Sequence, residues 1–208
     1  METAAIAQLL QPFIELDEMR LQIISKYIDL LLKWNARINL TAIRDPQEIV
    51  QRHFGESFFV AKYVLAQRSV ETAIDLGSGA GFPGVPLAIL APDIQLTLIE
   101  SQQKKATFLK ELIYLLGLKN VTVFSDRAEN YLGRAELVMF RAVEKFDQVL
   151  KMAERLTEAG GRIAMMIGSG QVELASRLVV EVGWSEAVTI PSGHSRELLI
   201  GTKTVKVE

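Results

Sequence analysis

Residues 73–84 read AIDLGSGAGFPG, a short strand-like run followed directly by a glycine-rich turn. Glycine at such a turn can adopt positive φ angles, and the missing Cβ lets the backbone approach a ligand closely. A dinucleotide-binding turn would read G-x-G-x-x-G and place its third glycine where Phe82 stands. The spacing here is instead D-x-G-x-G-x-G, with Asp75 two residues before Gly77. The stretch therefore predicts a strand, a ligand-binding turn and a helix that differ from the dinucleotide-binding form.

The sequence beyond this turn predicts a parallel sheet, because short β-branched runs alternate with amphipathic stretches as in repeated βαβ units. The predicted strands are residues 72–76, 94–100, 120–124, 137–141, 162–167, 184–190 and 198–204. The predicted helices among them are residues 85–91, 104–116, 146–158 and 171–182. Seven residues join the last two strands, too few for a parallel crossover, so those strands must pair antiparallel. We therefore expect residues 71–208 to form an α/β domain with a mostly parallel, seven-stranded, Rossmann-like sheet that ends in an antiparallel hairpin.

The first 70 residues have a different, helical pattern. Apolar residues recur at three- and four-residue spacing over residues 17–34, which predicts one amphipathic helix. A second helix is predicted over residues 46–65, with Asp45 as its N-cap and Pro46 at its first position. We expect residues 1–70 to form a helical segment that precedes the domain of residues 71–208.

The composition bounds the possible functions. The 208 residues are 49% hydrophobic and 23% charged, as in a soluble globular protein, and include no cysteine, which excludes disulfides, cysteine-ligated metals and thiolate nucleophiles. The start does not read as a signal peptide, and no apolar run approaches the roughly 18 residues of a membrane helix, so we expect a cytoplasmic protein that binds neither membrane nor metal. The net charge of −2 means that an RNA substrate would need a local basic patch. Candidates for that patch, or else simply solvated residues, are Arg37, Arg44, Arg52, Lys104, Lys105 and Lys110.

The turn resembles motif I of S-adenosylmethionine methyltransferases. A dinucleotide brings a pyrophosphate to bare helix amides, whereas the sulfonium cofactor has no phosphate and carries an ammonium group, which suits an acid near the turn. Glu100 ends the second predicted strand, where its carboxylate can accept hydrogen bonds from the ribose diol of either ligand. We expect S-adenosylmethionine as the cofactor, with Asp75, Gly77, Gly79 and Glu100 in its site. The structural alternatives are a strained turn without a ligand and, for Glu100, an ordinary solvated strand end.

The sequence also bears on the atom that is methylated. Without cysteine, C5 methylation of pyrimidines is excluded, because it needs a thiolate adduct. Residues 139–143 read MFRAV and lack the acid or Asn with Pro-Pro and an aromatic that amino-methylating enzymes place there. Acceptors with a free lone pair remain, such as guanine N7, alongside small molecules and proteins. Guanine N7 needs no general base, so positioning and electrostatics would supply most of the rate.

Several separate motifs together resemble the ribosomal RNA small-subunit methyltransferase G family, also called glucose-inhibited division protein B, over nearly the whole chain. They are WN at 34–35, NLTAI at 39–43, RHF at 52–54, ES at 56–57, DLGSGAGFPG at 75–84, RAE at 127–129 and RA at 141–142. The resemblance implies an S-adenosylmethionine methyltransferase fold and methylation of guanine N7 in 16S ribosomal RNA of the small ribosomal subunit; we expect a monomer. It also implies cofactor contacts by Gly77, Phe82, Ala128, Glu129 and Arg141. The family usually has Asp where Glu56 stands and Lys where Ile167 stands, and the second difference removes a cation.

Arg141 is the candidate catalytic residue, because it ends the fourth predicted strand at the edge where doubly wound folds bind ligands. The structural alternative is a strand-end arginine paired with Glu129 or Glu144. His53 is interpreted as a packing histidine. Asn35, Asn39 and Thr41 have two interpretations, a functional role or a purely structural role as capping and turn residues.

Three other functions remain open. They are a small-molecule methyltransferase, a non-enzymatic regulator that binds S-adenosylmethionine and, least favoured, an NAD-dependent oxidoreductase.

Overall fold

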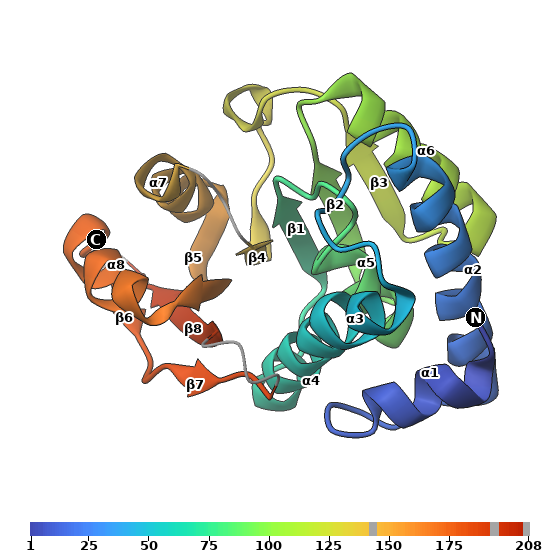
Figure 1. Ribbon diagram of the computed structural model, residues 1–208. Helices are drawn as coiled ribbons and strands as arrows, with labels where there is room; N and C mark the ends of the chain where they lie inside the picture. Colours follow the sequence, from blue (N-terminus) through green and yellow to red (C-terminus); the bar gives the residue numbers. More distant parts are fainter. Residues whose placement is uncertain (142–144, 192–195, 206–208) are drawn as a thin grey trace.

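A computed structural model describes residues 1–141, 145–191 and 196–205, which form one eight-stranded sheet with helices on both faces (Figure 1). The strands are β1 (Thr72–Leu76), β2 (Gln95–Ile99), β3 (Val121–Phe124), β4 (Ala135–Arg141), β5 (Thr157–Gly168), β6 (Val182–Trp184), β7 (Val188–Thr189) and β8 (Arg196–Lys203). The α-helices are α1 (Thr3–Leu10), α2 (Glu18–Asn35), α3 (Pro46–Ile49), α4 (Glu56–Gln67), α5 (Gly84–Leu90), α6 (Gln103–Leu116), α7 (Phe146–Leu156) and α8 (Val172–Leu178). A π-helix, η1 (Val50–Gly55), joins α3 to α4, and two short 3-10 helices are η2 (Ala128–Asn130) and η3 (Ser169–Gln171).

The strand order is β3-β2-β1-β4-β5-β8-β6, with β7 also paired to β8. Strands β1 to β5 are parallel, while β8 is antiparallel to β5, β6 and β7. The expected mostly parallel Rossmann-like sheet with antiparallel C-terminal strands is therefore confirmed. In this arrangement the carboxyl ends of β1, β2, β3 and β4 share one edge, which is where such sheets bind ligands.

The predicted strand over residues 184–190 is in fact two short strands, β6 and β7, so the sheet has eight strands and not seven. Trp184 pairs with Gly201 and Val188 pairs with Leu198. Between these two pairs the chain advances four residues from Trp184 to Val188 but only three along β8, from Leu198 to Gly201. One extra residue interrupts the ladder, as in a β-bulge.

Several helices differ from the predictions: α1 was not predicted, and α7 ends at Leu156 because β5 begins at Thr157. The predicted helix over residues 171–182 is shorter, because Val179 is already extended, with φ −133°. The predicted helix over residues 46–65 is divided into α3, η1 and α4, although its predicted N-cap is confirmed, since the Asp45 side chain accepts a hydrogen bond from Glu48 N.

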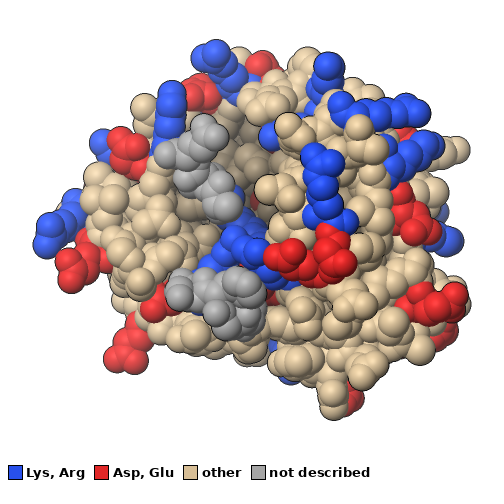
Figure 2. Space-filling view, viewed as in Figure 1, with Lys and Arg blue, Asp and Glu red and all other residues tan. Residues whose placement is uncertain are grey.

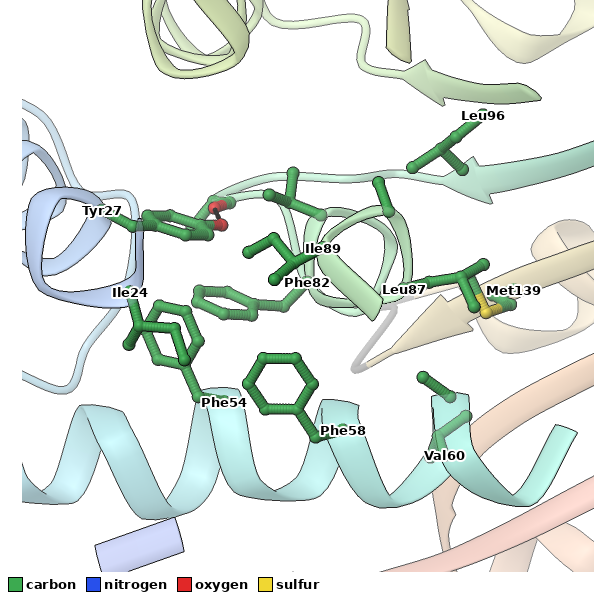
Figure 3. Packing of buried hydrophobic residues seen from close by; sticks show 14 of the residues in the cluster. Ile24, Tyr27, Phe54, Phe58, Val60, Phe82, Leu87, Ile89, Leu96 and Met139 are labelled. Carbon is green, nitrogen blue, oxygen red and sulfur yellow. Dashed lines mark hydrogen bonds between the residues drawn. The ribbon is translucent and has the colours of Figure 1, made fainter. Parts of the chain in front are cut away.

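The hydrophobic core has two layers, because successive residues of a strand face opposite sides of the sheet. In β4, Leu137 and Met139 pack with the N-terminal helices, α5 and α6, whereas Val138 and Phe140 pack with α7 and α8. In Figure 3, Tyr27 of α2 and side chains of η1 and α4, such as Phe54 and Phe58, pack against residues that follow β1, such as Phe82 and Ile89. Helices α1 to α4 therefore share a core with one face of the sheet, and the division of the chain at residue 70 stays a prediction.

Candidate functional site

The glycine turn leaves the end of β1 and enters α5, and Asp75 holds it in place. The buried Asp75 Oδ2 accepts hydrogen bonds from Ser78 Oγ at 2.6 Å and from Gly84 N at 3.0 Å. A Cβ at Gly84 would lie 2.6 Å from Asp75 Oδ2, so only glycine allows this close approach. Asp75 is not among the residues that line the two hollows described below, and its direct contact with a cofactor stays a prediction.

Burial raises the pKa of Asp75 to about 6, although the hydrogen bonds from Ser78 and Gly84 act in the opposite direction. Since the unfolded chain has a pKa near 3.9, the folded state binds the additional proton between about pH 4 and pH 6. Stability from this group is therefore present below about pH 4 and is lost as the pH rises through 6.

Replacing Asp75 with Asn should flatten this pH dependence, because an amide does not ionise. We expect the wild-type free energy of unfolding to fall by about 2 kcal/mol more than that of Asp75→Asn between pH 4 and pH 7. Urea denaturation of both proteins at unit pH steps measures the difference. Parallel curves would show that Asp75 does not titrate in the folded protein.

Glu100 lies directly after β2 and ties the glycine turn to the next loop. Its Oε2 accepts a hydrogen bond from Gly79 N at 2.9 Å, and its Oε1 accepts one from Gln102 N at 2.8 Å. The residue is only 6% exposed. Its carboxylate is thus fixed at the sheet edge, as a ribose-binding acid requires.

The larger hollow at this edge has a volume of about 410 Å³. It brings together four of the predicted residues, Gly77, Glu100, Ala128 and Glu129. Lys145, Gln148 and Val149 also line it, at the start of α7. Sequence reasoning missed these three, since only their position after β4 could have indicated them.

A smaller hollow of about 240 Å³ adjoins the first, because Gly77 lines both. Gly79, Phe82 and Arg141 were predicted site residues and line it. Its other lining residues are Leu40, Thr41, His53, Ser78, Ala80 and Lys105. Figure 2 shows a hollow in the middle of this face, with Lys and Arg side chains inside it and beside it.

Phe82 lines the smaller hollow and is buried in an aromatic cluster, of which Figure 3 shows Tyr27, Phe54 and Phe82. Its ring stacks on Tyr27 with centroids 5.2 Å apart and meets Phe54 edge-on at 5.0 Å. On the other side the His53 ring stacks on it at 4.9 Å. The cluster attaches α2 and η1 to the glycine turn.

His53 is neutral at pH 7. Burial and then the charges of Arg141, Arg196 and Arg52 lower its pKa to about 3. Its Nε2 lies 2.7 Å from Thr41 Oγ1. These are the contacts expected of a packing histidine, although the residue also lines the hollow.

Arg141 ends β4 with its side chain only 6% exposed. Its Nη2 donates to the Arg52 carbonyl at 2.7 Å and lies 2.9 Å from Glu56 Oε2. Burial lowers its pKa to about 10, with Glu56 acting in the opposite direction, so it stays charged at pH 7. Its ion-pair partner is therefore Glu56 and not Glu129, while Glu144 lies outside the described residues.

The candidate basic residues do not converge on one spot. Lys105 lines the smaller hollow, Lys110 Nζ donates to Ser125 Oγ at 3.3 Å, and Arg52 pairs with Glu48 at 2.7 Å. Arg37, Arg44 and Lys104 are exposed.

Asn35 has the turn role that was one of its two interpretations. Its Oδ1 accepts hydrogen bonds from Leu40 N and Thr41 N. It thereby fixes the segment from which Leu40 and Thr41 reach the smaller hollow.

Within the part of the chain that the structure describes, no group of three or more His, Cys, Asp or Glu could hold a metal ion. The described helices also include none with the length and apolar character needed to cross a bilayer.

Comparisons with known proteins found similar sequences over most of this chain. The model of a family described as rRNA small subunit methyltransferase G matches residues 20–188. The chain is 35% identical over 205 residues to the ribosomal RNA small subunit methyltransferase G of Chromobacterium violaceum, covering 96% of this chain and 97% of that protein. It is 42% identical over 159 residues to the protein of the same name from Xylella fastidiosa, covering 75% and 73%.

Solved structures are similar in fold at low sequence identity. A mutant of MtNAS in complex with S-adenosylmethionine has a TM-score of 0.62 at 17% identity, covering 90% of this chain and 77% of that one. A SAM dependent methyltransferase from Aquifex aeolicus has a TM-score of 0.59 at 16% identity, covering 77% and 94%. These likenesses concern the fold alone.

Proposed function

This chain belongs to the rRNA small subunit methyltransferase G family, and from that premise we propose that it transfers a methyl group from S-adenosylmethionine to N7 of a guanosine in 16S ribosomal RNA. The observation that carries the proposal is the pair of adjoining hollows that share Gly77 at the carboxyl edge of the sheet. One suits a nucleoside-bearing cofactor, and the other suits a flat acceptor beside a basic side chain.

The residues of the larger hollow fit S-adenosylmethionine. Glu100 offers a fixed carboxylate for the ribose diol, and Ala128 and Glu129 lie after β3 for the adenine. A Cβ at Gly77 would meet no atom within 4 Å, so the turn leaves open space beside the backbone. Arg141 Nη1 is buried and has no hydrogen-bond partner among the described residues, which suits the cofactor carboxylate or an oxygen of the acceptor. When bound, the cofactor supplies a methyl group activated by the positive sulfur.

The residues of the smaller hollow fit an acceptor that needs no deprotonation. His53, with a pKa of about 3, is too weak a base to remove a proton at pH 7, and guanine N7 carries none. Arg141 and Lys105 supply positive charge for the base oxygen or a phosphate. The work of the chain is then to bind and orient the two reactants. We propose that it does so as a cytoplasmic monomer without a metal ion.

Replacing Glu100 with Ala should weaken S-adenosylmethionine binding by about 1.5 to 3 kcal/mol, because the ribose loses hydrogen bonds to a charged acceptor. Isothermal calorimetry measures the change. Glu173→Ala is the matched control, since Glu173 is an exposed residue of α8 whose side chain pairs with the exposed Arg177 and lines neither hollow. An unchanged dissociation constant for Glu100→Ala would place this residue outside the cofactor site.

The proposed substrate is tested by comparing acceptors. With labelled cofactor, we expect methyl transfer to intact small ribosomal subunits and less to naked 16S RNA, and hydrolysis of the product should place the label on guanine N7. The rate at subsaturating subunits should fall steeply with salt, because phosphate contacts release counterions. Transfer to a small neutral molecule with little salt dependence would favour a small-molecule enzyme. Cofactor binding without transfer to any acceptor would favour a regulator.

A further inference from the structure

The π-helix η1 and the first residue of α4 together place three groups beside the end of β4. Such π-helical segments are rare and often mark functional sites, because the wider turn redirects side chains and carbonyls. Here the Arg52 carbonyl and the Glu56 carboxylate both contact Arg141, and His53 lines the same hollow. The chain therefore brings a segment near residue 50 against a strand end near residue 140.

Among the described residues, the hydrogen bond and the ion pair of Arg141 are both made through Nη2. Nη2 meets both the Arg52 carbonyl and Glu56 Oε2, at 2.7 and 2.9 Å. Nη1 is buried but has no hydrogen-bond partner among the described residues, although Arg141 lines the smaller hollow. A buried donor without an acceptor costs free energy, which indicates that a ligand accepts a hydrogen bond from Nη1.

Glu56 is shared by two arginines. Arg196, at the start of β8, lies with Nη1 3.0 Å from the same Oε2, and Glu56 is fully buried. Arg52 already pairs with Glu48. One carboxylate thus faces two guanidinium groups, and the surplus positive charge lies beside the smaller hollow.

We propose that Glu56 is a positioning residue for methyl transfer. Together with the Arg52 carbonyl it fixes Nη2 of Arg141, so that Nη1 points to the ligand in the smaller hollow. Arginine is required because its planar fork has one nitrogen to be held and another to be presented, whereas lysine has a single nitrogen. The inference rests on the proposed function, in which Arg141 contacts the cofactor or the target base.

The first test is Arg141→Lys, which keeps the charge opposite Glu56 but lacks the second nitrogen. We expect its melting temperature to stay within a few degrees of wild type, while methyl transfer to small subunits falls as far as in Arg141→Ala. Recovery by lysine to within threefold of wild type would overturn the proposal, because a purely structural ion pair needs only the charge.

The second test is a double-mutant cycle between Glu56→Gln and Arg141→Ala. We expect Glu56→Gln to lower kcat/KM at least tenfold in the wild-type background and less than twofold in the Arg141→Ala background. Additive losses would overturn the proposal. Glu48→Gln, which removes the neighbouring acid that pairs with Arg52, is the control and should stay within twofold of wild type.

Two measurements keep the result independent of the proposed function and of folding. The first is cofactor affinity, measured by calorimetry for the same variants. If Arg141 binds the cofactor, the losses of affinity in Glu56→Gln and Arg141→Ala are not additive, even when small subunits prove not to be the substrate. If Arg141→Ala alters neither affinity nor transfer, the positioning role of Glu56 is rejected. Should Glu56→Gln fail to fold because two arginines lose their counter-charge, Arg141→Lys decides.

Discussion

Gly79→Val should fold and yet bind S-adenosylmethionine at least about a hundredfold more weakly than wild type, a loss of about 2.7 kcal/mol. Gly79 lines the smaller hollow with φ +58°, beside Gly77, which lines both hollows. Its N–H also donates to Glu100 Oε2, the carboxylate proposed for the ribose in the larger hollow. The atom nearest to an added Cβ is Gly77 O at 3.8 Å. The valine side chain would therefore find room, but at the edge of the hollow where the ligand must approach the backbone. Its branched Cβ also strains a left-handed backbone by about 1 to 2 kcal/mol.

Gly117→Val separates the backbone strain from the blocked site. Gly117 caps α6 with φ +66°, and a Cβ there meets no atom within 4 Å. It is not among the residues that line either hollow. Both variants should lose a similar amount of stability in urea, but only Gly79→Val should lose cofactor binding by calorimetry. Normal affinity in folded Gly79→Val would remove the turn from the cofactor site.

Arg141→Ala should fold and lose at least about a hundredfold in kcat/KM for methyl transfer, or about 2.7 kcal/mol of transition-state stabilisation. The variant loses the buried donor Nη1, and the hydrogen bond proposed between Nη1 and the ligand would be charge-assisted and shielded from water. Folding should survive because Glu56 keeps Arg196 as its partner at 3.0 Å. Labelled-methyl transfer to small subunits at subsaturating concentrations of both substrates gives the measurement.

A second buried arginine provides the matched control. Arg162 lies in β5, 7% exposed, and donates to the carbonyls of Val64 and Arg68 at the other end of the sheet. Arg162→Ala should lower the melting temperature without changing kcat/KM. For Arg141→Ala, a parallel loss of cofactor affinity would assign the arginine to the cofactor, and an unchanged affinity would assign it to the RNA. Full activity would leave Arg141 with a structural role only.

The sequence by itself determined the fold class and predicted most of the residues that we propose for the cofactor. Asp75, Gly77 and Gly79 follow from the local spacing of the turn, since positive φ angles and close approach demand glycine there. Glu100 could be predicted because it ends the strand next to β1, and the carboxyl ends of parallel strands meet at one edge. Residues 128 and 129 were implied by the family resemblance, and both line the same hollow as Glu100.

The tertiary structure alone decided which partners surround these residues. The partners of Arg141 are Glu56 and the Arg52 carbonyl, and Arg196 joins them from β8. The start of α7 closes the larger hollow, and one extra residue in the last hairpin divides a predicted strand into β6 and β7. Periodicity and spacing report on residues a few positions apart, whereas the contacts of Arg141 with Arg52 and of Arg196 with Glu56 join residues 89 and 140 positions apart. Such contacts depend on the packing of α2, η1 and the strand ends around a common core, which no local pattern encodes.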